Sequence, residues 1–140
     1  MGVNEKYVDL LESLKLAITD FEKTLNADFT KYDAQEIDWI KNAQIQKFQF
    51  CVELTWKTAK VYLETLQQKI YTPKSTTKDL FLYQIIEEDV YLSFMSCIDD
   101  RNKLSHIYKL EMFELILSEI PKYFQTIFEI HTALSKIKFV

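Results

Sequence analysis

The helix that decides the fold runs through residues 47–64, which read KFQFCVELTWKTAKVYLE. This stretch is the middle of a predicted helix over residues 34–69, because apolar side chains recur there every three to four positions. One apolar stripe comprises Ile37, Phe48, Val52, Ala59, Leu63, Leu66 and Ile70. A second stripe comprises Trp39, Ala43, Phe50, Leu54 and Val61. At roughly 100° per residue the two stripes lie nearly opposite each other, so both sides of the helix should be buried, either by other helices of one chain or by a second subunit.

Helical periodicity continues on both sides of this segment. The further helices that we predict span residues 4–26, residues 77–87, a stretch after Glu87-Glu88-Asp89, and residues 109–137. Asp33, three positions before Glu36, predicts a capping box at the start of the long helix. Pro73 predicts a break in the chain, and Pro121 should kink or split the last helix. We therefore expect an all-α, antiparallel up-and-down bundle of four to five helices, with residues 1–140 in a single domain.

The composition favours a helical domain without a membrane segment. One glycine and two prolines leave few sites for tight hairpins, and 48% hydrophobic residues suffice for a core. The net charge of -4 argues against broad binding to polyanions but allows a local cationic cleft. Cys51 and Cys97 form no CxxC pair, no signal peptide is visible, and no apolar run approaches the ~18 residues of a membrane helix. We expect a cytoplasmic protein with two reduced, buried cysteines and neither a metal nor another cofactor.

The chemically richest stretch is residues 101–108, which read RNKLSHIY. Arg101 can hold a phosphate through two parallel hydrogen bonds, and His106 can transfer a proton near neutral pH. These groups are the minimum set for cleaving a phosphodiester without a metal. If the fourth helix continues far enough, Asn102 and His106 lie four positions apart and can meet on one surface.

Helical geometry also predicts which of these side chains turn inward. Arg101 and Asn102 fall on the apolar face of the fourth helix, the face of Phe94. Charged groups lie on such a face when they are paired or line a cleft. The residues expected on the polar side are Ser96, Asp99, Asp100 and Lys103. An alternative interpretation is that Arg101 caps the C-terminus of the helix and pairs with a carboxylate such as Asp99.

The two stretches quoted above resemble one known family. The pattern Arg-Asn-x-x-x-His-x-Tyr of residues 101–108 resembles the signature of HEPN domains, specifically of the HepT toxins that accompany MNT nucleotidyltransferase antitoxins. Residues 47–64 resemble the Arg-Phe-Glu-Phe-x-x-Glu-Leu-x-Trp-Lys pattern of the same group, with Lys47 in place of the usual Arg and Gln49 in place of the usual Glu. This branch is also called nucleotidyltransferase substrate-binding protein. The resemblance spans nearly the whole chain.

The resemblance implies a homodimer in which two copies of the motif face each other across a cleft, in agreement with the two-sided helix. It implies an endoribonuclease that needs no metal. Arg101 would bind the scissile phosphate, His106 would take the proton of the ribose 2′-hydroxyl, and Asn102 would orient either group. The cognate MNT-type nucleotidyltransferase would silence this toxin by attaching AMP to Tyr108.

Each of these assignments has a plainer alternative. The chain could be a non-catalytic substrate-binding subunit of a nucleotidyltransferase complex. Tyr108 could be an ordinary amphipathic tyrosine at a helix start. His131 lies within the apolar stripe of the last helix, where a hydrogen-bonded core or interface histidine is expected. The lysines that either extend a phosphate-binding track or carry ordinary surface charge are Lys57, Lys60 and Lys103.

Overall fold

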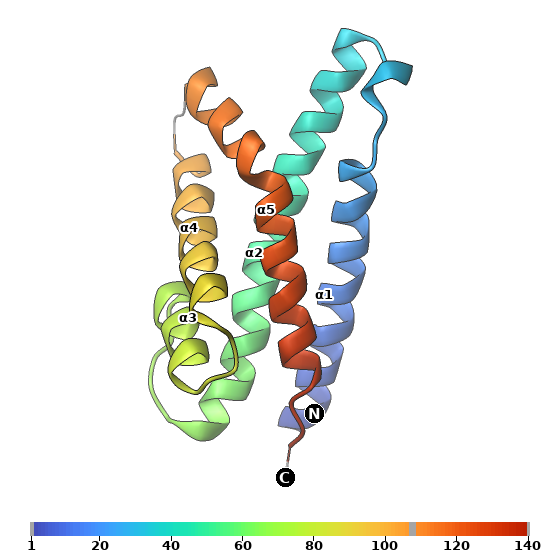
Figure 1. The fold of residues 1–140 in the computed structure, drawn as a ribbon. Helices are drawn as coiled ribbons and strands as arrows, with labels where there is room; N and C mark the ends of the chain where they lie inside the picture. Colours follow the sequence, from blue (N-terminus) through green and yellow to red (C-terminus); the bar gives the residue numbers. More distant parts are fainter. Residues whose placement is uncertain (1, 107–108, 140) are drawn as a thin grey trace.

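The helices of the protein run alternately up and down (Figure 1). The structure, a computed structural model, describes residues 2–106 and 109–139. In these two ranges the regular elements are α1 (Val3–Leu25), the 3₁₀-helix η1 (Phe29–Lys31), α2 (Ala34–Leu66), α3 (Pro73–Leu82), α4 (Glu88–Leu104) and α5 (Leu110–Ser135). Every regular element of the described part is helical, so the prediction of an all-α bundle is confirmed.

The central helix of the bundle is α2, which packs against α1, α3, α4 and α5. In Figure 1 the chain rises in α1, descends in α2, rises again in α4 and descends in α5, with the short α3 near the lower end. Both termini therefore lie at the lower end of the bundle. The end of α4, where the sequence motif begins, lies at the opposite, upper end.

The start of α2 is fixed by the predicted capping box. The carboxylate of Asp33 accepts a hydrogen bond from the backbone N–H of Glu36 at 2.8 Å, and the carboxylate of Glu36 accepts one from the backbone N–H of Asp33 at 3.1 Å. Two amides near the helix start thereby gain acceptors. The helix begins where the sequence predicted and ends at Leu66, three residues before the expected end, because Gln67 adopts an extended backbone.

The sequence-based bounds of α3 were wrong at both ends. The helix begins at Pro73 rather than near residue 77, because Thr72 and Ser75 form a second capping box in front of it. Pro73 occupies the first helical position, where its missing N–H has no helical partner to lose. The helix ends at Leu82, and Gln84 then adopts a positive φ of 61°. The proline was therefore a start signal for α3 as much as a break after α2.

Pro121 kinks α5 instead of splitting it. The helix runs unbroken from Leu110 to Ser135 through this residue. Figure 1 shows the first turns of α5 leaning away from the direction of its remaining turns. A proline inside a helix removes one hydrogen bond and its ring crowds the carbonyl four residues before it, which bends the axis.

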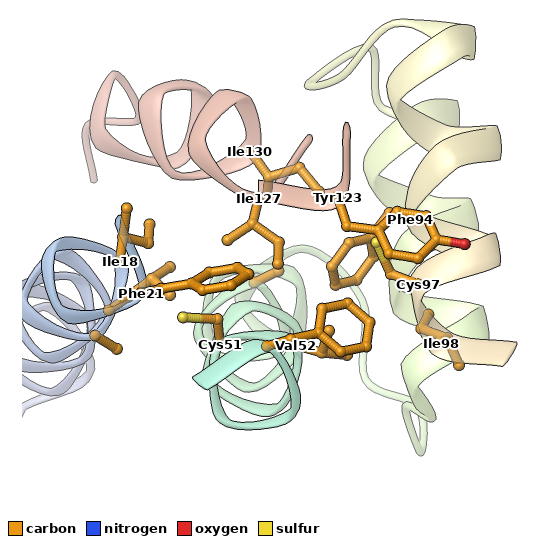
Figure 2. Packing of buried hydrophobic residues seen from close by; sticks show 14 of the residues in the cluster. Ile18, Phe21, Cys51, Val52, Phe94, Cys97, Ile98, Tyr123, Ile127 and Ile130 are labelled. Carbon is orange, nitrogen blue, oxygen red and sulfur yellow. The ribbon is translucent and has the colours of Figure 1, made fainter. Parts of the chain in front are cut away.

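The core is built by all four long helices. Figure 2 shows Phe21 of α1, Cys51 of α2 and Phe94 of α4 together with Tyr123 of α5 in one layer of packed side chains. The ring of Tyr123 stacks on Phe48 with centroids 5.4 Å apart. Burial raises the pKa of the Cys51 thiol to about 12, so this cysteine is a buried, neutral group. Cys51 and Cys97 are both free and buried, as the sequence predicted.

The two apolar stripes of α2 have different surroundings in one chain. The members of the first stripe that are buried are Phe48, Val52, Ala59 and Leu63. In the second stripe only Val61 is buried, whereas Trp39 is 61% exposed and Phe50 is 55% exposed. A shallow hollow of about 290 Å³ lies beside Trp39, between Tyr32 and Ala43. The helices of a single chain therefore cover the middle of the first stripe but leave Leu66 and Ile70 at its end exposed. In the second stripe they leave Trp39 and Phe50 at the surface.

An ion-pair cluster around a buried carboxylate joins α3 to the segment that follows α2. Asp79, 5% exposed, accepts a hydrogen bond from the hydroxyl of Tyr71 at 2.8 Å and pairs with the ammonium of Lys69, also at 2.8 Å. The Lys69 nitrogen also lies 4.9 Å from the centre of the Tyr71 ring. Burial and the Asp79 carboxylate raise the pKa of Tyr71, so its hydroxyl remains a hydrogen-bond donor.

Replacing Asp79 with alanine is expected to lower the free energy of unfolding by about 1–3 kcal/mol, because Tyr71 and Lys69 both lose their acceptor. Urea denaturation of Asp79→Ala and of Asp9→Ala, a change at an exposed aspartate of α1, measures the difference. An Asp79→Ala midpoint equal to that of the wild type would show that the cluster does not stabilise the fold.

Candidate functional site

The last turn of α4 positions Arg101, the only arginine in the sequence. Basic residues are favourable at this end of a helix because its carbonyl groups carry partial negative charge. Leu104, 8% exposed, anchors the helix end in the core. The side chain of Arg101 is 32% exposed, so the prediction that it turns toward the apolar side is confirmed.

The partner of Arg101 is Glu53 of α2. Nη2 of Arg101 lies 2.8 Å from Oε2 of Glu53, and this ion pair links α4 to the central helix. The alternative interpretation, in which Arg101 lies at the helix end and pairs with a carboxylate, therefore agrees with the structure. The carboxylate is not the expected Asp99, which instead contacts Nζ of Lys74 in α3 at 2.7 Å. Arg101 is thus held by a residue from another helix rather than by its own.

Glu53 is the centre of a cluster of donors on α2. Its Oε1 pairs with Nζ of Lys57 at 3.2 Å, and its Oε2 accepts a hydrogen bond from the indole N–H of Trp56 at 3.3 Å. Nζ of Lys60 lies 5.8 Å from the centre of the Trp56 ring. We call Glu53, Trp56, Lys57, Lys60 and Arg101 the Glu53 cluster.

The ionisation of Glu53 follows from these contacts. Partial burial acts to raise its pKa, but the hydrogen bonds from Trp56 and Lys57 and the positive charge of Arg101 outweigh burial, so the pKa lies below its ordinary value. A carboxyl whose pKa falls on folding contributes stability above its unfolded-state pKa. That contribution is lost as the pH falls through the lowered pKa of the folded state.

The Glu53 cluster can bind an anion. Lys57 and Arg101 both pair with one carboxylate, and Lys60 adds a third positive charge over the Trp56 ring, so the cluster keeps a net positive charge after the ion pairs have formed. The ion pair with Glu53 uses one nitrogen of the Arg101 guanidinium, which carries five N–H donors in total. The remaining donors have the geometry to hold a phosphate through parallel hydrogen bonds.

Asn102 and His106 do not lie where the sequence suggested. α4 ends at Leu104, and the backbone N–H of His106 bonds to the carbonyl of Lys103 at 3.2 Å, so His106 follows the helix in a turn. The idea that Asn102 and His106 could meet across one helical turn depended on a longer helix and is wrong. Both side chains are exposed.

The exposure of Asn102 has a geometric cause. The buried face of α4 is centred on the side of Phe94, Cys97 and Leu104, which includes Arg101. Asn102 lies roughly 100° further around the helix axis than Arg101 and therefore faces solvent. The expectation that both residues share the apolar face holds for Arg101 and is wrong for Asn102.

The three lysines proposed for RNA binding have different partners. Lys57 and Lys60 belong to the Glu53 cluster, whereas Lys103 pairs with Asp100 at 3.5 Å. Asp100 also accepts a hydrogen bond from the hydroxyl of Tyr123 at 2.6 Å, so it is half-buried and not on the polar side as expected. Tyr108, the proposed modification site, lies outside the described residues.

His131 is a hydrogen-bonded histidine at a contact between two helices, in agreement with the sequence prediction of a core or interface histidine. It is half-buried in α5, and burial lowers the pKa of its imidazole. A hydrogen bond to the backbone of Leu11 in α1 opposes this shift, and the charge of Lys15 adds to it. His131 therefore joins α5 to α1 at a distance from the Arg101–His106 motif along the chain.

Glu53 is the site residue that our sequence reasoning missed. It was noted as part of a pattern but was given no role. The available signal was its spacing from Trp56 and Lys57, three and four positions later, which places all three side chains on one helical surface. Sequence spacing could not predict that Glu53 also pairs with Arg101 on α4, because the two residues lie far apart in the chain.

Comparisons with known proteins agree with the fold and with the family that the sequence resembles. Residues 9–136 match the family described as nucleotidyltransferase substrate binding protein like. No curated protein matches the chain. A crystal structure of a protein from Thermus thermophilus has the same fold, with a TM-score of 0.74 and 18% sequence identity over 88% of this chain and 99% of that chain. Within the described residues no helix combines the length and apolarity needed to cross a membrane. The chain belongs to the nucleotidyltransferase substrate-binding protein-like family.

Proposed function

We propose that this protein is a metal-independent endoribonuclease, the toxin of a HEPN/MNT toxin–antitoxin module. The single observation that carries the proposal is the placement of the only arginine. Arg101 is half-buried in a cluster with surplus positive charge, five residues before an exposed histidine. A phosphate-binding group and a proton-transfer group are the two requirements for cleaving RNA through its own 2′-hydroxyl.

The proposed reaction uses these residues in sequence. Arg101 binds the scissile phosphate and stabilises the charge that develops on its oxygens. His106 takes the proton of the 2′-hydroxyl, and the 2′-oxygen attacks phosphorus while the bond to the 5′-oxygen breaks. The leaving 5′-oxygen takes up a proton, and the products are a 2′,3′-cyclic phosphate and a 5′-hydroxyl. Asn102, the exposed neighbour of Arg101 in the sequence, orients the phosphate.

The site is completed by a second copy of the chain in this proposal. Phe50, an exposed member of the second stripe, lies on the same side of α2 as Glu53 and Lys57, three and seven positions later. A copy that covers Phe50 brings its own Glu53 cluster close to the first one. Two such clusters concentrate positive charge in a groove on a protein whose net charge is -4.

The proposed partner is an MNT-type nucleotidyltransferase that attaches AMP to Tyr108. This residue follows His106 by two positions, so an attached nucleotide adds bulk and negative charge next to the site where the RNA phosphate binds. The support for this partner is the family to which the chain belongs, whose description names a nucleotidyltransferase.

The second candidate function is a non-catalytic subunit that presents a substrate to a nucleotidyltransferase. One observation favours it: in the described residues the exposed imidazole of His106 has neither a hydrogen bond nor an ion pair that would orient it for proton transfer. The Glu53 cluster would then bind a phosphate of the presented substrate without reacting with it.

An RNA cleavage assay in the presence of a metal chelator tests the proposal. The purified wild-type protein is expected to cut total RNA and to leave 2′,3′-cyclic phosphate ends, because its own side chains supply charge stabilisation and proton transfer. DNA of the same sequence, which lacks the 2′-hydroxyl, is the matched control and should remain intact. Binding of RNA without cleavage would instead favour the substrate-presenting subunit.

A further inference from the structure

The contacts of Glu53 assign it a role that the motif does not contain. We propose that Glu53 is a positioning residue: its carboxylate fixes the Arg101 guanidinium so that the remaining donors face the scissile phosphate. This inference rests on the proposed function. It deepens that function by adding a residue from α2 to a site that the motif confines to residues 101–108.

The first argument is that the carboxylate itself is immobilised. Oε1 is held by Lys57, and Oε2 is held by both Trp56 and Arg101. Trp56 and Lys57 lie three and four positions after Glu53 on α2, so they hold the carboxylate from within the same helix. α2 is 33 residues long, is capped at its start and packs against every other α-helix. Glu53 is therefore a fixed acceptor on the most constrained element of the fold.

The second argument concerns the freedom of Arg101. An unpaired arginine side chain has several rotatable bonds, and it loses this freedom when it binds a phosphate. The contact at 2.8 Å between Nη2 and Glu53 removes part of that freedom before any RNA arrives. It also ties the last turn of α4 to α2, three residues before the helix ends at Leu104.

The third argument separates a positioning role from a binding role. A carboxylate beside a bound phosphate repels it, so Glu53 weakens RNA binding while it improves the geometry of the reaction. Its replacement should therefore affect affinity and rate in opposite directions. A residue that merely stabilises the fold would lower both.

The test compares Glu53→Gln with Asp99→Asn. Glutamine keeps a hydrogen-bond acceptor for Trp56 and removes the charge. Asp99→Asn removes a charge at the same end of α4 from a residue that contacts Lys74 and not Arg101. For Glu53→Gln we expect single-turnover cleavage at least about 10-fold slower and affinity for an uncleavable 2′-O-methyl RNA that is equal or tighter. Asp99→Asn should stay within about twofold of the wild type in both measurements.

A second measurement does not depend on cleavage. Because Arg101 is the only arginine, a ¹⁵N NMR spectrum of the guanidinium region reports on this one side chain. The wild type should give separate Nη signals, because the ion pair restricts rotation, and Glu53→Gln should give averaged ones. Averaged signals in the wild type would overturn the inference even if the Gln variant failed to fold.

The two measurements separate this inference from the proposed function. Wild-type protein that binds RNA but does not cut it contradicts the nuclease assignment, whereas the spectrum and the RNA affinity still decide whether Glu53 restrains Arg101. Cleavage by the wild type together with an undiminished rate for Glu53→Gln would refute the positioning role alone. Loss of both affinity and rate in Glu53→Gln would show that Glu53 supports only the fold.

Discussion

His106→Ala is expected to abolish RNA cleavage and to leave the helical bundle intact. A general base contributes about 10²- to 10⁴-fold to the rate, and no other histidine lies near the motif in the sequence. The imidazole is exposed, and the hydrogen bond that the structure describes at this residue is made by its backbone N–H to Lys103, which alanine retains. Single-turnover cleavage of RNA measures the rate, and thermal unfolding checks the fold.

The other histidine of the chain provides the control. His131 is half-buried and bonds to the backbone of Leu11, so His131→Ala should lower the free energy of unfolding by about 1–2 kcal/mol and leave the cleavage rate of the folded protein unchanged. His106→Ala should therefore lower the cleavage rate but not the stability, whereas His131→Ala should lower the stability but not the cleavage rate. An His106→Ala protein that cuts RNA at the wild-type rate would end the nuclease assignment.

Features that depend on neighbouring residues in the sequence could be predicted well. The capping box of Asp33 and Glu36 and the start of α2 needed only a spacing rule. The start of α3 was missed although its signal was equally local, because Pro73 marks both the break after α2 and the first position of the next helix. The prediction used Pro73 only as a break and overlooked that proline also favours the first position of a helix.

Features that depend on packing could be predicted only in part. Helical geometry correctly predicted that Arg101 faces the bundle. It wrongly predicted the same for Asn102, because the neighbouring helices determine where the buried face of α4 is centred. The partner of Arg101 is 48 positions away, on α2, and periodicity carries no information about such a pair. The second stripe of α2 shows the same limit: its apolar pattern was visible, but whether one chain covers it was not.

With the site completed by a second copy, as we propose, Phe50→Glu is expected to convert the proposed dimer into a monomer and to remove RNA cleavage with it. Phe50 is 55% exposed in the single chain, so a charge there costs the monomer little. In an interface the same carboxylate would be buried without a partner, which weakens association by at least about 30-fold at a central position. Sedimentation measures the mass, and the cleavage assay follows the activity.

Leu16→Glu provides the matched control for this experiment. Leu16 on α1 is 68% exposed and lies outside the second stripe, so the same change of charge should leave both mass and activity unaltered. Three outcomes for Phe50→Glu are informative. A monomer without activity supports a site built by two copies, because each copy keeps its own Arg101 and His106. A monomer that still cuts RNA means that one chain suffices for catalysis. An unchanged dimer means that the second stripe faces something other than a second copy, and the nucleotidyltransferase is then the partner to test on this surface.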